Sequence, residues 1–419
     1  MTNYIVLAIP VFFLLIGLEL LITRLQEKDY YRLSDSIGDL SCGIVDQLLE
    51  VFAKTALFAG YAYLYTRHRF FSVPMESWTA WVVCFIGVDF LYYWFHRMSH
   101  EVNAFWAAHV VHHQSEEYNL AVALRQGAFQ GWFSWAFYLP LALVGFPPLM
   151  FLTLSSINTL YQFWIHTRVI GRLGPLEWVL NTPSNHRVHH GRNPKYIDRN
   201  HGGTLIVWDR LFGTFKAEEE EPVYGVTTPL KSWNPVWANL QAWAELVHKA
   251  RGANRLADRL RFFVKPPGWQ PDEMGGFQPA PEVDKASYQK FDIPVSRGLA
   301  AYAFLQFVVV LVTTAVLLFR QGEVTAMTRA GAAVILVTSL VALSGLLEGK
   351  AWAAPLEGLR LAVLGTVAAR TFAGQAVFPV AALATVAAAA GVTYALLRLR
   401  PPLAPQEDVP ARTQGQEAR

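Results

Sequence analysis

Long apolar runs recur along this chain and constrain its fold more than any other feature. A helix needs about 20 apolar residues to cross a bilayer. Residues 4–23 meet this length, and no small-residue cleavage site follows, so we interpret them as a retained anchor. The last quarter holds four more apolar runs, at 297–319, 331–347, 356–369 and 377–397. The third of these is short, and a helix lying on the membrane surface is the alternative for it.

Three more apolar stretches lie before residue 170 and lead to histidines. Residues 78–95 run directly into His96. Residues 129–143 and 149–165 surround a Gly-Phe-Pro-Pro turn and end at His166. The turn predicts a helical hairpin.

A weaker span candidate lies between the first run and residue 78. Its first half carries Asp46, Glu50 and Lys54 at successive steps of four, which places them on one helical face. We expect this helix to start at the membrane interface and to enter the bilayer near Thr55.

The composition separates this chain from ordinary soluble enzymes. Of its 419 residues, 53% are hydrophobic and 16% are charged, and the mean hydropathy is positive. A polytopic membrane protein with a substantial polar part fits best. The net charge of +3, without a long basic run, gives no sign of a nucleic-acid partner. Two cysteines, Cys42 and Cys84, exclude a disulfide framework and make a thiolate metal site improbable.

These patterns predict the fold class and the domains. We expect an all-α polytopic membrane protein with a transmembrane helical stalk, a histidine-rich helical cap and a C-terminal transmembrane bundle. Residues 1–295 form the first domain, and residues 296–400 form the C-terminal segments. Residues 401–419, rich in Pro, Gln and Glu, read as a disordered tail.

Three histidine clusters mark the polar part. Their patterns are HxxxH at 96–100, HxxHH at 109–113 and HxxHH at 186–190. Positions i, i+3 and i+4 share one face of a helix, and imidazole suits zinc, copper, iron and nickel. A structural zinc site needs four ligands, whereas these clusters with His166 supply nine, and His201 is an uncertain tenth. Two metal ions are therefore expected. His68 and His248 lack such company and read as ordinary polar residues.

The clusters also suggest an orientation. Arginines surround the histidines, and basic residues follow the first and last apolar runs. The excess of Lys and Arg in cytosolic loops then predicts a cytosolic active site, although Arg67 and Arg69 lie on the opposite side and weaken this signal.

Carboxylates near the clusters are candidates for orienting the ligand rings. Asp89 lies two helical turns before His96, and a packing hydrogen bond is the equally weighted alternative. Glu101, Glu116 and Asp209 are further candidates, although a surface carboxylate is the simpler interpretation of each. The metalloprotease pattern HExxH is absent.

The run DFLYYWFHRMSHEVN at 89–103 resembles the fatty acid hydroxylase/sterol desaturase superfamily. The resemblance continues through 109–126, YQFWIH at 161–166, 181–215 and VYGVTTP at 223–229, and is strongest over 80–235. Within that superfamily the flanking residues are most similar to the alkylglycerol monooxygenases, also called glyceryl-ether monooxygenases. Asn185 and His201 stand where that branch carries His and Tyr, which leaves His201 open.

The resemblance implies a membrane-bound di-iron enzyme that uses O2 to hydroxylate a lipid. For the alkylglycerol branch, it implies attack on the ether-linked carbon, with release of a fatty aldehyde and glycerol, and tetrahydrobiopterin as electron donor. An electron-donor protein is the alternative donor. Tyr92, Tyr93 and Trp94 would line the lipid access path or act as ordinary interfacial aromatics. Carried onto matching positions, the implied metal ligands are His96, His100, His109, His112, His113, His166, His186, His189 and His190.

Two other functions stay open from the sequence. The first is another reaction of the superfamily, such as sterol desaturation, C-methyl oxidation, or hydroxylation of a fatty acyl chain or carotenoid. The second is a metal transporter or sensor without redox chemistry, which would be expected to place ligands and carboxylates inside the membrane spans.

Overall fold

The computed structural model describes residues 4–399 of the chain. Over this range the chain is helical from α1 to α14, with short 3-10 helices and two isolated β-bridges but no strand. The predicted all-α architecture is confirmed. The tail expected at 401–419 lies outside the described residues.

Five helices within the described range are long and apolar enough to cross a membrane, which confirms an integral membrane protein. They are α1 (Tyr4–Leu25), α3 (Trp78–Glu101), α11 (Arg297–Phe319), α12 (Ala326–Leu347) and α14 (Gly374–Leu399). Ser77 caps α3, because its side chain accepts a hydrogen bond from the Ala80 amide at 3.2 Å.

Four segments that the sequence favours as spans fall short of this standard. α5 (Gln130–Val144) and α6 (Pro148–Trp164) form the predicted hairpin. Their lengths of 15 and 17 residues rise only about 22 and 26 Å, less than the hydrocarbon core of about 30 Å. α13 (Ala353–Phe372) carries charged residues, and α2 (Leu33–His68) is a single helix of 36 residues with a polar first half.

The polar half of α2 differs from the expectation of an interfacial helix. Asp35, Asp39 and Asp46 are buried inside the protein rather than exposed at a membrane surface. This half of α2 packs against α9 (Pro235–Gly252) and the short helix at Val122–Leu124. The acids of α2 therefore belong to the support of the polar domain.

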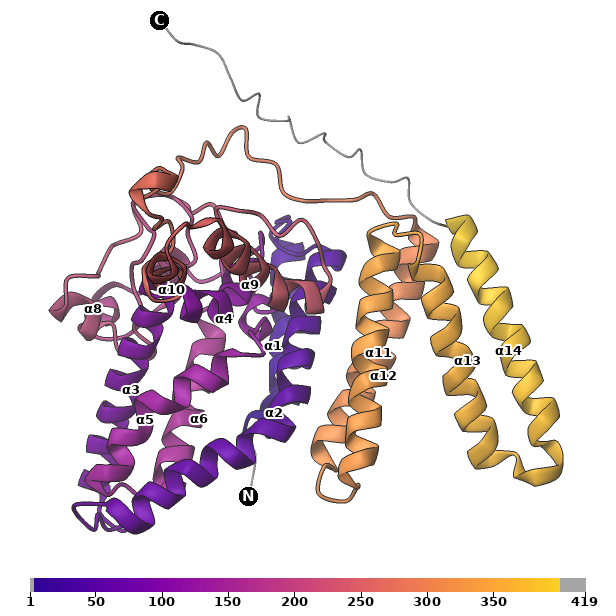
Figure 1. Ribbon diagram of the computed structural model, residues 1–419, viewed down its shortest axis with the longest axis horizontal. Helices are drawn as coiled ribbons and strands as arrows, with labels where there is room; N and C mark the ends of the chain where they lie inside the picture. Colours follow the sequence, from indigo (N-terminus) through magenta and orange to yellow (C-terminus); the bar gives the residue numbers. More distant parts are fainter. Residues whose placement is uncertain (1–3, 400–419) are drawn as a thin grey trace, which may run out of the picture. The chain divides into compact units, whose positions relative to one another are not determined.

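Helix packing in the first part of the chain builds a stalk below a cap (Figure 1). α3 packs against α5, α6 and α4 (Asn103–His113), and α2 packs against α5. A buried cluster that includes Tyr61, Cys84 and Met150 joins these stalk helices. Both cysteines are buried and free, as expected.

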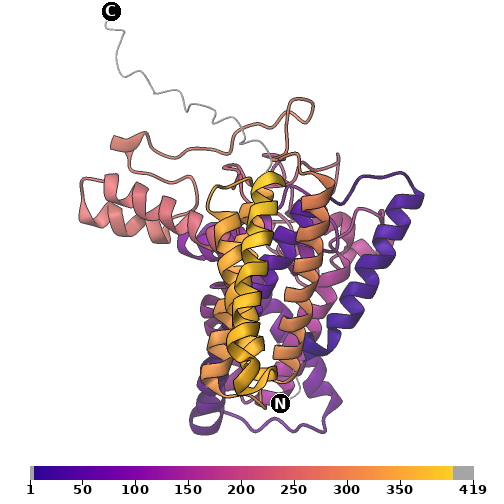
Figure 2. The same ribbon diagram turned by 90° about the vertical axis from the view of Figure 1, so that its right-hand side faces the viewer.

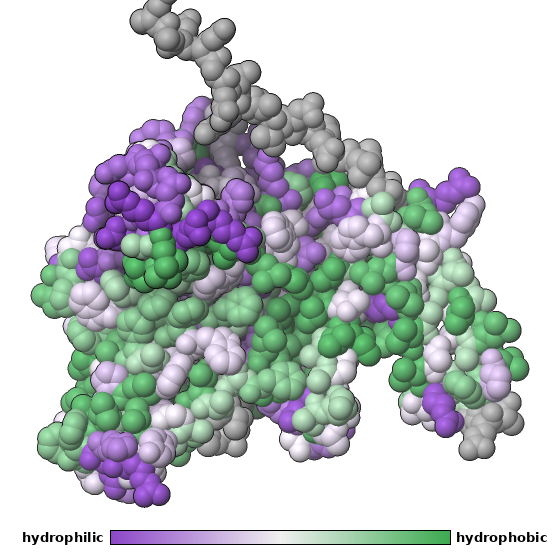
Figure 3. Space-filling view, in the orientation of Figure 1, coloured by the Kyte–Doolittle hydropathy of each residue, from purple (hydrophilic) through white to green (hydrophobic). Residues whose placement is uncertain are grey.

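The cap holds α4, α7 (Pro183–His189), α8 (Val207–Leu211), α9 and α10 (Leu256–Val264). Around α9 and α10 the surface is hydrophilic, whereas hydrophobic side chains cover the stalk helices below (Figure 3). This division of the surface is what a membrane-embedded stalk with a water-facing cap requires.

The chain separates into two compact units, and each unit is made of two segments that alternate along the sequence. One unit comprises 1–291 and 304–344, and the other comprises 292–303 and the residues from 345 onward. This division passes through α11 and α12, and the domain boundary expected near residue 295 stays a prediction.

In the second unit, α13 and α14 lie side by side as an antiparallel pair (Figures 1 and 2). Small residues allow this approach, because a side chain at Gly358 would collide with Thr393. Glu357 is fully buried there. It pairs with Arg360 at 2.5 Å and accepts a hydrogen bond from Tyr302 at 2.5 Å, so the charge on α13 is neutralised.

Candidate metal centre

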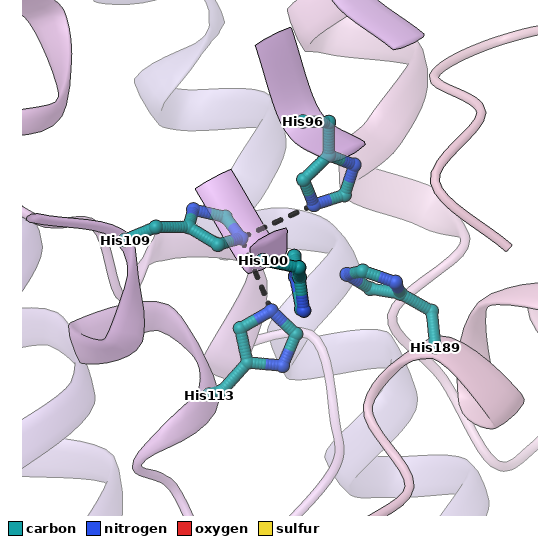
Figure 4. Close-up of side chains that lie close together, drawn as sticks. All are labelled: His96, His100, His109, His113 and His189. Atoms are coloured by element: carbon teal, nitrogen blue, oxygen red, sulfur yellow. Dashed lines mark hydrogen bonds between the residues drawn. The ribbon is translucent and has the colours of Figure 1, made fainter. Parts of the chain in front are cut away.

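Nine buried histidines meet in two groups inside the first unit. Within each group, one ring nitrogen per residue lies within 4.8 Å of the others. The five-histidine group, shown converging in Figure 4, comprises His96, His100, His109, His113 and His189. The four-histidine group comprises His112, His166, His186 and His190. The structure thus brings together all the predicted ligands except His201.

Helical spacing decides which group each ring of the first two clusters joins. His96 and His100 lie one turn apart on α3 and both join the five-histidine group. On α4, His109 and His113 are also one turn apart and join that same group. His112 points from a neighbouring position on α4 into the four-histidine group.

α7 divides its histidines in the opposite sense. His186 and His190 join the four-histidine group, whereas His189 joins the five-histidine group. His166, just beyond the end of α6, completes the four-histidine group. The rings of His113 and His190 stack at 4.4 Å between centroids, so the two groups are adjacent.

Hydrogen bonds place the proton on the Nδ1 atom of five rings. In each case Nδ1 lies 2.6 to 2.9 Å from an oxygen that can only accept. Nδ1 therefore donates, and Nε2 carries a bare lone pair. The five donor–acceptor pairs are His96 to the His201 carbonyl, His109 to Gln130 Oε1, His112 to the Arg125 carbonyl, His166 to the Gln162 carbonyl, and His189 to the Arg199 carbonyl.

The bare Nε2 atoms face one another. Nε2 of His96 lies 3.1 Å from Nε2 of His109, and Nε2 of His112 lies 3.1 Å from Nε2 of His166. With both protons on Nδ1, neither pair has a hydrogen to share, and the lone pairs repel. Nitrogen ligands about 2.1 Å from one ion and at right angles lie about 3 Å apart. A cation in each group would resolve the repulsion, so the residues fit two metal ions.

Burial keeps the rings in the neutral form that binds metal. Desolvation lowers the pKa of His109 and of His166 to about 4. It also holds the pKa values of His112, His113, His186, His189 and His190 well below the ordinary value. At neutral pH these rings present lone pairs rather than protons.

His201 lies beside the five-histidine group without joining it. Its ring centroid is 5.1 Å from that of His100, and its main-chain oxygen orients His96. Both ring nitrogens are buried without a hydrogen-bond partner, and Nδ1 lies 3.7 Å from Asp209 Oδ1. The structure therefore assigns His201 an orienting main-chain contact.

Asp209 acts on the site through the backbone. It accepts hydrogen bonds from the amides of His201 and Gly202 and from the Thr214 hydroxyl, each at 2.7 Å. The His201 carbonyl orients His96, so Asp209 positions the His96 ring indirectly, by holding the backbone at His201.

Asp89 makes packing hydrogen bonds rather than a hydrogen bond to a ligand ring, so the second of its two equally weighted interpretations agrees with the described structure. It accepts from Asn158 at 2.6 Å, from the Thr204 and Leu205 amides, and from Trp208 Nε1 at 2.9 Å. Four donors satisfy this buried carboxylate, so it anchors the loop after His201 to α3.

The two remaining acids likewise contact other residues. Glu101 pairs with Arg97 at 2.8 Å and is partly exposed. Glu116 accepts from the Tyr288 hydroxyl and from the Phe291 amide. Neither is within hydrogen-bonding distance of a ligand ring in the described structure.

The aromatic run after Phe90 does not form one lipid-facing wall. Tyr93 is fully buried, and its hydroxyl lies 3.0 Å from that of Thr214. Tyr92 donates to Gln162 Oε1 at 2.5 Å. Trp94 is half-buried and packs against Phe212.

Arg125 supports the four-histidine side, a role that no sequence pattern indicated. It donates to the Val111 carbonyl at 2.6 Å and to Gln114 Oε1, and pairs with Asp39 at 3.1 Å. Its own carbonyl oxygen accepts a hydrogen bond from His112 Nδ1.

The support of His109 was also missed. Gln130, the first residue of α5, accepts a hydrogen bond from His109 Nδ1 through its side-chain oxygen. A close approach at Gly127 makes this possible, since a side chain there would collide with the Ala108 carbonyl on α4. His68 and His248 are exposed and belong to neither group.

Comparisons with known proteins place these residues in a familiar context. The family model for fatty acid hydroxylases matches residues 81–214, a range that contains all ten candidate histidines. The chain is 42% identical to the alkylglycerol monooxygenase of Xenopus tropicalis over 74% of this chain and 69% of that protein. It is 39% identical to the alkylglycerol monooxygenase of Homo sapiens, over 85% and 81% of the two chains. No solved structure matches the chain.

Proposed function

Because the chain belongs to the alkylglycerol monooxygenase family, it is a membrane-bound lipid monooxygenase, and we propose that its substrate is an alkylglycerol. The reaction would insert one oxygen atom at the carbon beside the ether oxygen. The resulting hemiacetal breaks into a fatty aldehyde and glycerol. One oxygen atom enters the lipid, and the other leaves as water with two electrons and two protons from a donor.

The observation that carries this proposal is the pairing of bare Nε2 atoms in two adjacent groups. Five neutral imidazoles would hold one iron ion and four would hold the other. When bound, the ions supply open coordination positions at which O2 is reduced. The imidazoles bring no negative charge, which favours water or hydroxide as further ligands.

The residues of the chain bury the rings of this centre and orient five of them. The Nδ1 acceptors turn the Nε2 atoms of five rings inward before any ion arrives, and such outer contacts tune affinity. All nine rings are buried, so bulk water is excluded from the site. Asp209 and Arg125 fix the acceptors themselves.

We propose a reduced pterin such as tetrahydrobiopterin as the donor. A pocket of about 180 Å³ lies between α4, α9 and the 267–278 segment. Trp106 forms one wall, and its ring is 5.0 Å from His100 and 5.6 Å from His113. Trp269, Gln241 and Glu245 also line it, which gives a flat heterocycle an aromatic wall and hydrogen-bonding partners.

The donor can be tested with one variant pair on α9. Glu245→Gln should weaken binding of the reduced pterin, measured by quenching of tryptophan fluorescence. His248→Gln, exposed on the same helix, is the control. If only a partner protein sustains turnover and the pterin neither binds nor supports it, the donor proposal is wrong.

We also propose that the cap faces the cytosol. The arginines around the histidine clusters support this orientation. Cysteine labelling of the cap from either side of sealed vesicles would test it. Labelling of the cap from the lumenal side alone would show that the cap faces the lumen and would contradict the proposal.

The function is tested with purified full-length protein. Iron-loaded protein with O2, donor and 1-O-hexadecylglycerol should release hexadecanal with matched O2 uptake. Oxidation of a sterol, fatty acyl lipid or carotenoid instead would assign another reaction of the superfamily. Iron binding without O2 uptake on any lipid would favour a transporter or sensor.

A further inference from the structure

α10 carries a stripe of exposed apolar side chains at the rim of the cap. Leu256, Leu260 and Val264 follow one another at steps of four, so they lie along one face of the helix. They are 71%, 63% and 65% exposed. A row of large apolar side chains left open in this way marks a surface that meets lipid or a partner.

The same helix and the residues just before it are strongly basic. Residues 249–265 hold six Lys or Arg and one acid, Asp258, whereas the whole chain has a net charge of only +3. Arg259 and Arg261 are exposed and flank the apolar stripe on its two sides. Asp258 is buried on the inner face and pairs with Arg261 at 2.8 Å. A basic helix with one apolar face is typical of helices that lie on an anionic membrane surface.

The position of α10 in the first unit agrees with this pattern. α9 and α10 run across the direction of the stalk helices rather than along it (Figures 1 and 2). Where α10 lies in Figure 3, hydrophobic side chains are on the stalk side of the cap and hydrophilic ones are above them. A bilayer that surrounds the hydrophobic stalk would therefore meet α10 at the level of its headgroups.

The inner face of α10 is fixed to the metal-binding part of the cap. Phe262 is buried and packs in a cluster with Ala107 of α4 and Ala250 of α9. The carbonyl of Lys265, just beyond α10, accepts a hydrogen bond from the Asn103 amide at the start of α4 at 3.0 Å. α4 carries three of the nine histidines. α10 therefore links the outer surface of the cap to a helix of the metal centre.

We propose that α10 is an interfacial helix that binds the anionic headgroups of the surrounding bilayer. The three side chains of the stripe lie among the upper acyl carbons, and Arg259 and Arg261 reach the lipid phosphates. The partner is a lipid surface because the stripe has basic residues on both sides and lies level with the upper end of the lipid-facing stalk. This inference does not depend on the identity of the substrate.

Depth-dependent quenching tests this position in full-length protein reconstituted in lipid nanodiscs. Leu260→Cys is labelled with a fluorophore, which is selective because Cys42 and Cys84 are buried. Lipids with a nitroxide near the headgroup should quench this label about twofold more than lipids with a nitroxide near the chain end. Lys195→Cys, which is exposed beside Glu219 on the cap, is the control and should be quenched by neither.

Two results of this experiment would overturn the proposal. Quenching at Leu260 no stronger than at Lys195 would show that lipid does not reach α10 and would leave the stripe to a protein partner. Strongest quenching from the chain end would place the helix in the hydrocarbon core instead of the interface.

The charges are tested in the same labelled protein with the double variant Arg259→Gln and Arg261→Gln. In the wild type, nitroxide-labelled phosphatidylglycerol should quench more than nitroxide-labelled phosphatidylcholine. The variant should lower this preference by up to about fivefold for each charge removed. Arg259→Lys with Arg261→Lys removes the same guanidinium hydrogen bonds but keeps the charges, so it should retain the preference. Equal quenching by both lipids in the wild type, or equal losses in the Gln and Lys variants, would contradict binding of anionic headgroups.

Discussion

The two histidine groups use the same ligand in different numbers and with different support. In the five-histidine group a side chain, Gln130, orients His109. In the four-histidine group the carbonyls of Arg125 and Gln162 orient His112 and His166. On a six-coordinate ion, five imidazoles leave one open position and four leave two. The four-histidine group thus has fewer ligands to spare. Its two oriented rings, His112 and His166, both depend on main-chain carbonyls, whereas the five-histidine group combines two main-chain carbonyls with the side chain of Gln130.

The largest effect should follow removal of a ligand from the smaller group. His112→Ala leaves three imidazoles there, so we expect loss of that ion and of all turnover. His100→Ala leaves four in the other group and should retain more iron. Metal analysis and aldehyde formation measure both. Normal turnover by His112→Ala, or equal iron loss in both variants, would contradict the claim that the four-histidine group tolerates the loss of a ligand less well.

The next largest effect concerns the support of the four-histidine side. Asp39→Asn leaves the buried Arg125 charge without its partner and should cost about 3 kcal/mol of stability. Burial raises the pKa of Asp39 to about 6, although Arg125 opposes this shift. Below that pH the wild-type carboxyl is itself neutral, so the difference between the proteins should shrink. Thermal unfolding in detergent at pH 7.5 and 5 measures it, and a difference that grows on acidification would contradict this role.

A smaller and more local effect should follow from Gln130→Leu. His109 would lose its acceptor, and iron affinity of the five-histidine group should fall about 10- to 100-fold. Gln162→Leu is the counterpart in the other group, and it should have less effect because His166 keeps its main-chain acceptor. Chelator competition measures both variants. Equal losses would remove the distinction between side-chain and main-chain support.

The last effect is a pH dependence that both groups share and that no single substitution is needed to see. The pKa of both His109 and His166 is about 4 in the folded chain, against about 6.5 for an exposed imidazole. Between these values the unfolded chain binds more protons, so metal-free protein should lose stability as pH falls. At pH 5 the loss is about 2 kcal/mol for each ring. A melting temperature that rises from pH 7 to pH 5 would contradict the neutral, buried state of both groups.

The sequence predicted which histidines come together better than it predicted their surroundings, for a physical reason. Spacing along one helix places His109 and His113 on one face, and apolar length predicts α1 and α3. The division of nine histidines into five and four depends on how α4 and α7 pack, which no local pattern encodes. The acceptors of the Nδ1 protons are mostly carbonyls, and every residue has one.

The carboxylates and the hairpin show the same limit. Asp89 has the right spacing to reach His96, but a loop more than a hundred residues later supplies its donors. The Gly-Phe-Pro-Pro turn predicted the hairpin of α5 and α6. Its helices are nonetheless too short to cross the bilayer, because the cap already begins at their ends.

The interleaving of the two groups along α4 and α7 also sets an order of events during synthesis. The five-histidine group lacks His189 and the four-histidine group lacks His190 until the ribosome has made the third cluster. By then α1 and α3 have long been made, so the chain would enter the bilayer before either ion has a complete site. Insertion should therefore precede metal loading, and both ions should be captured in one late stage of maturation.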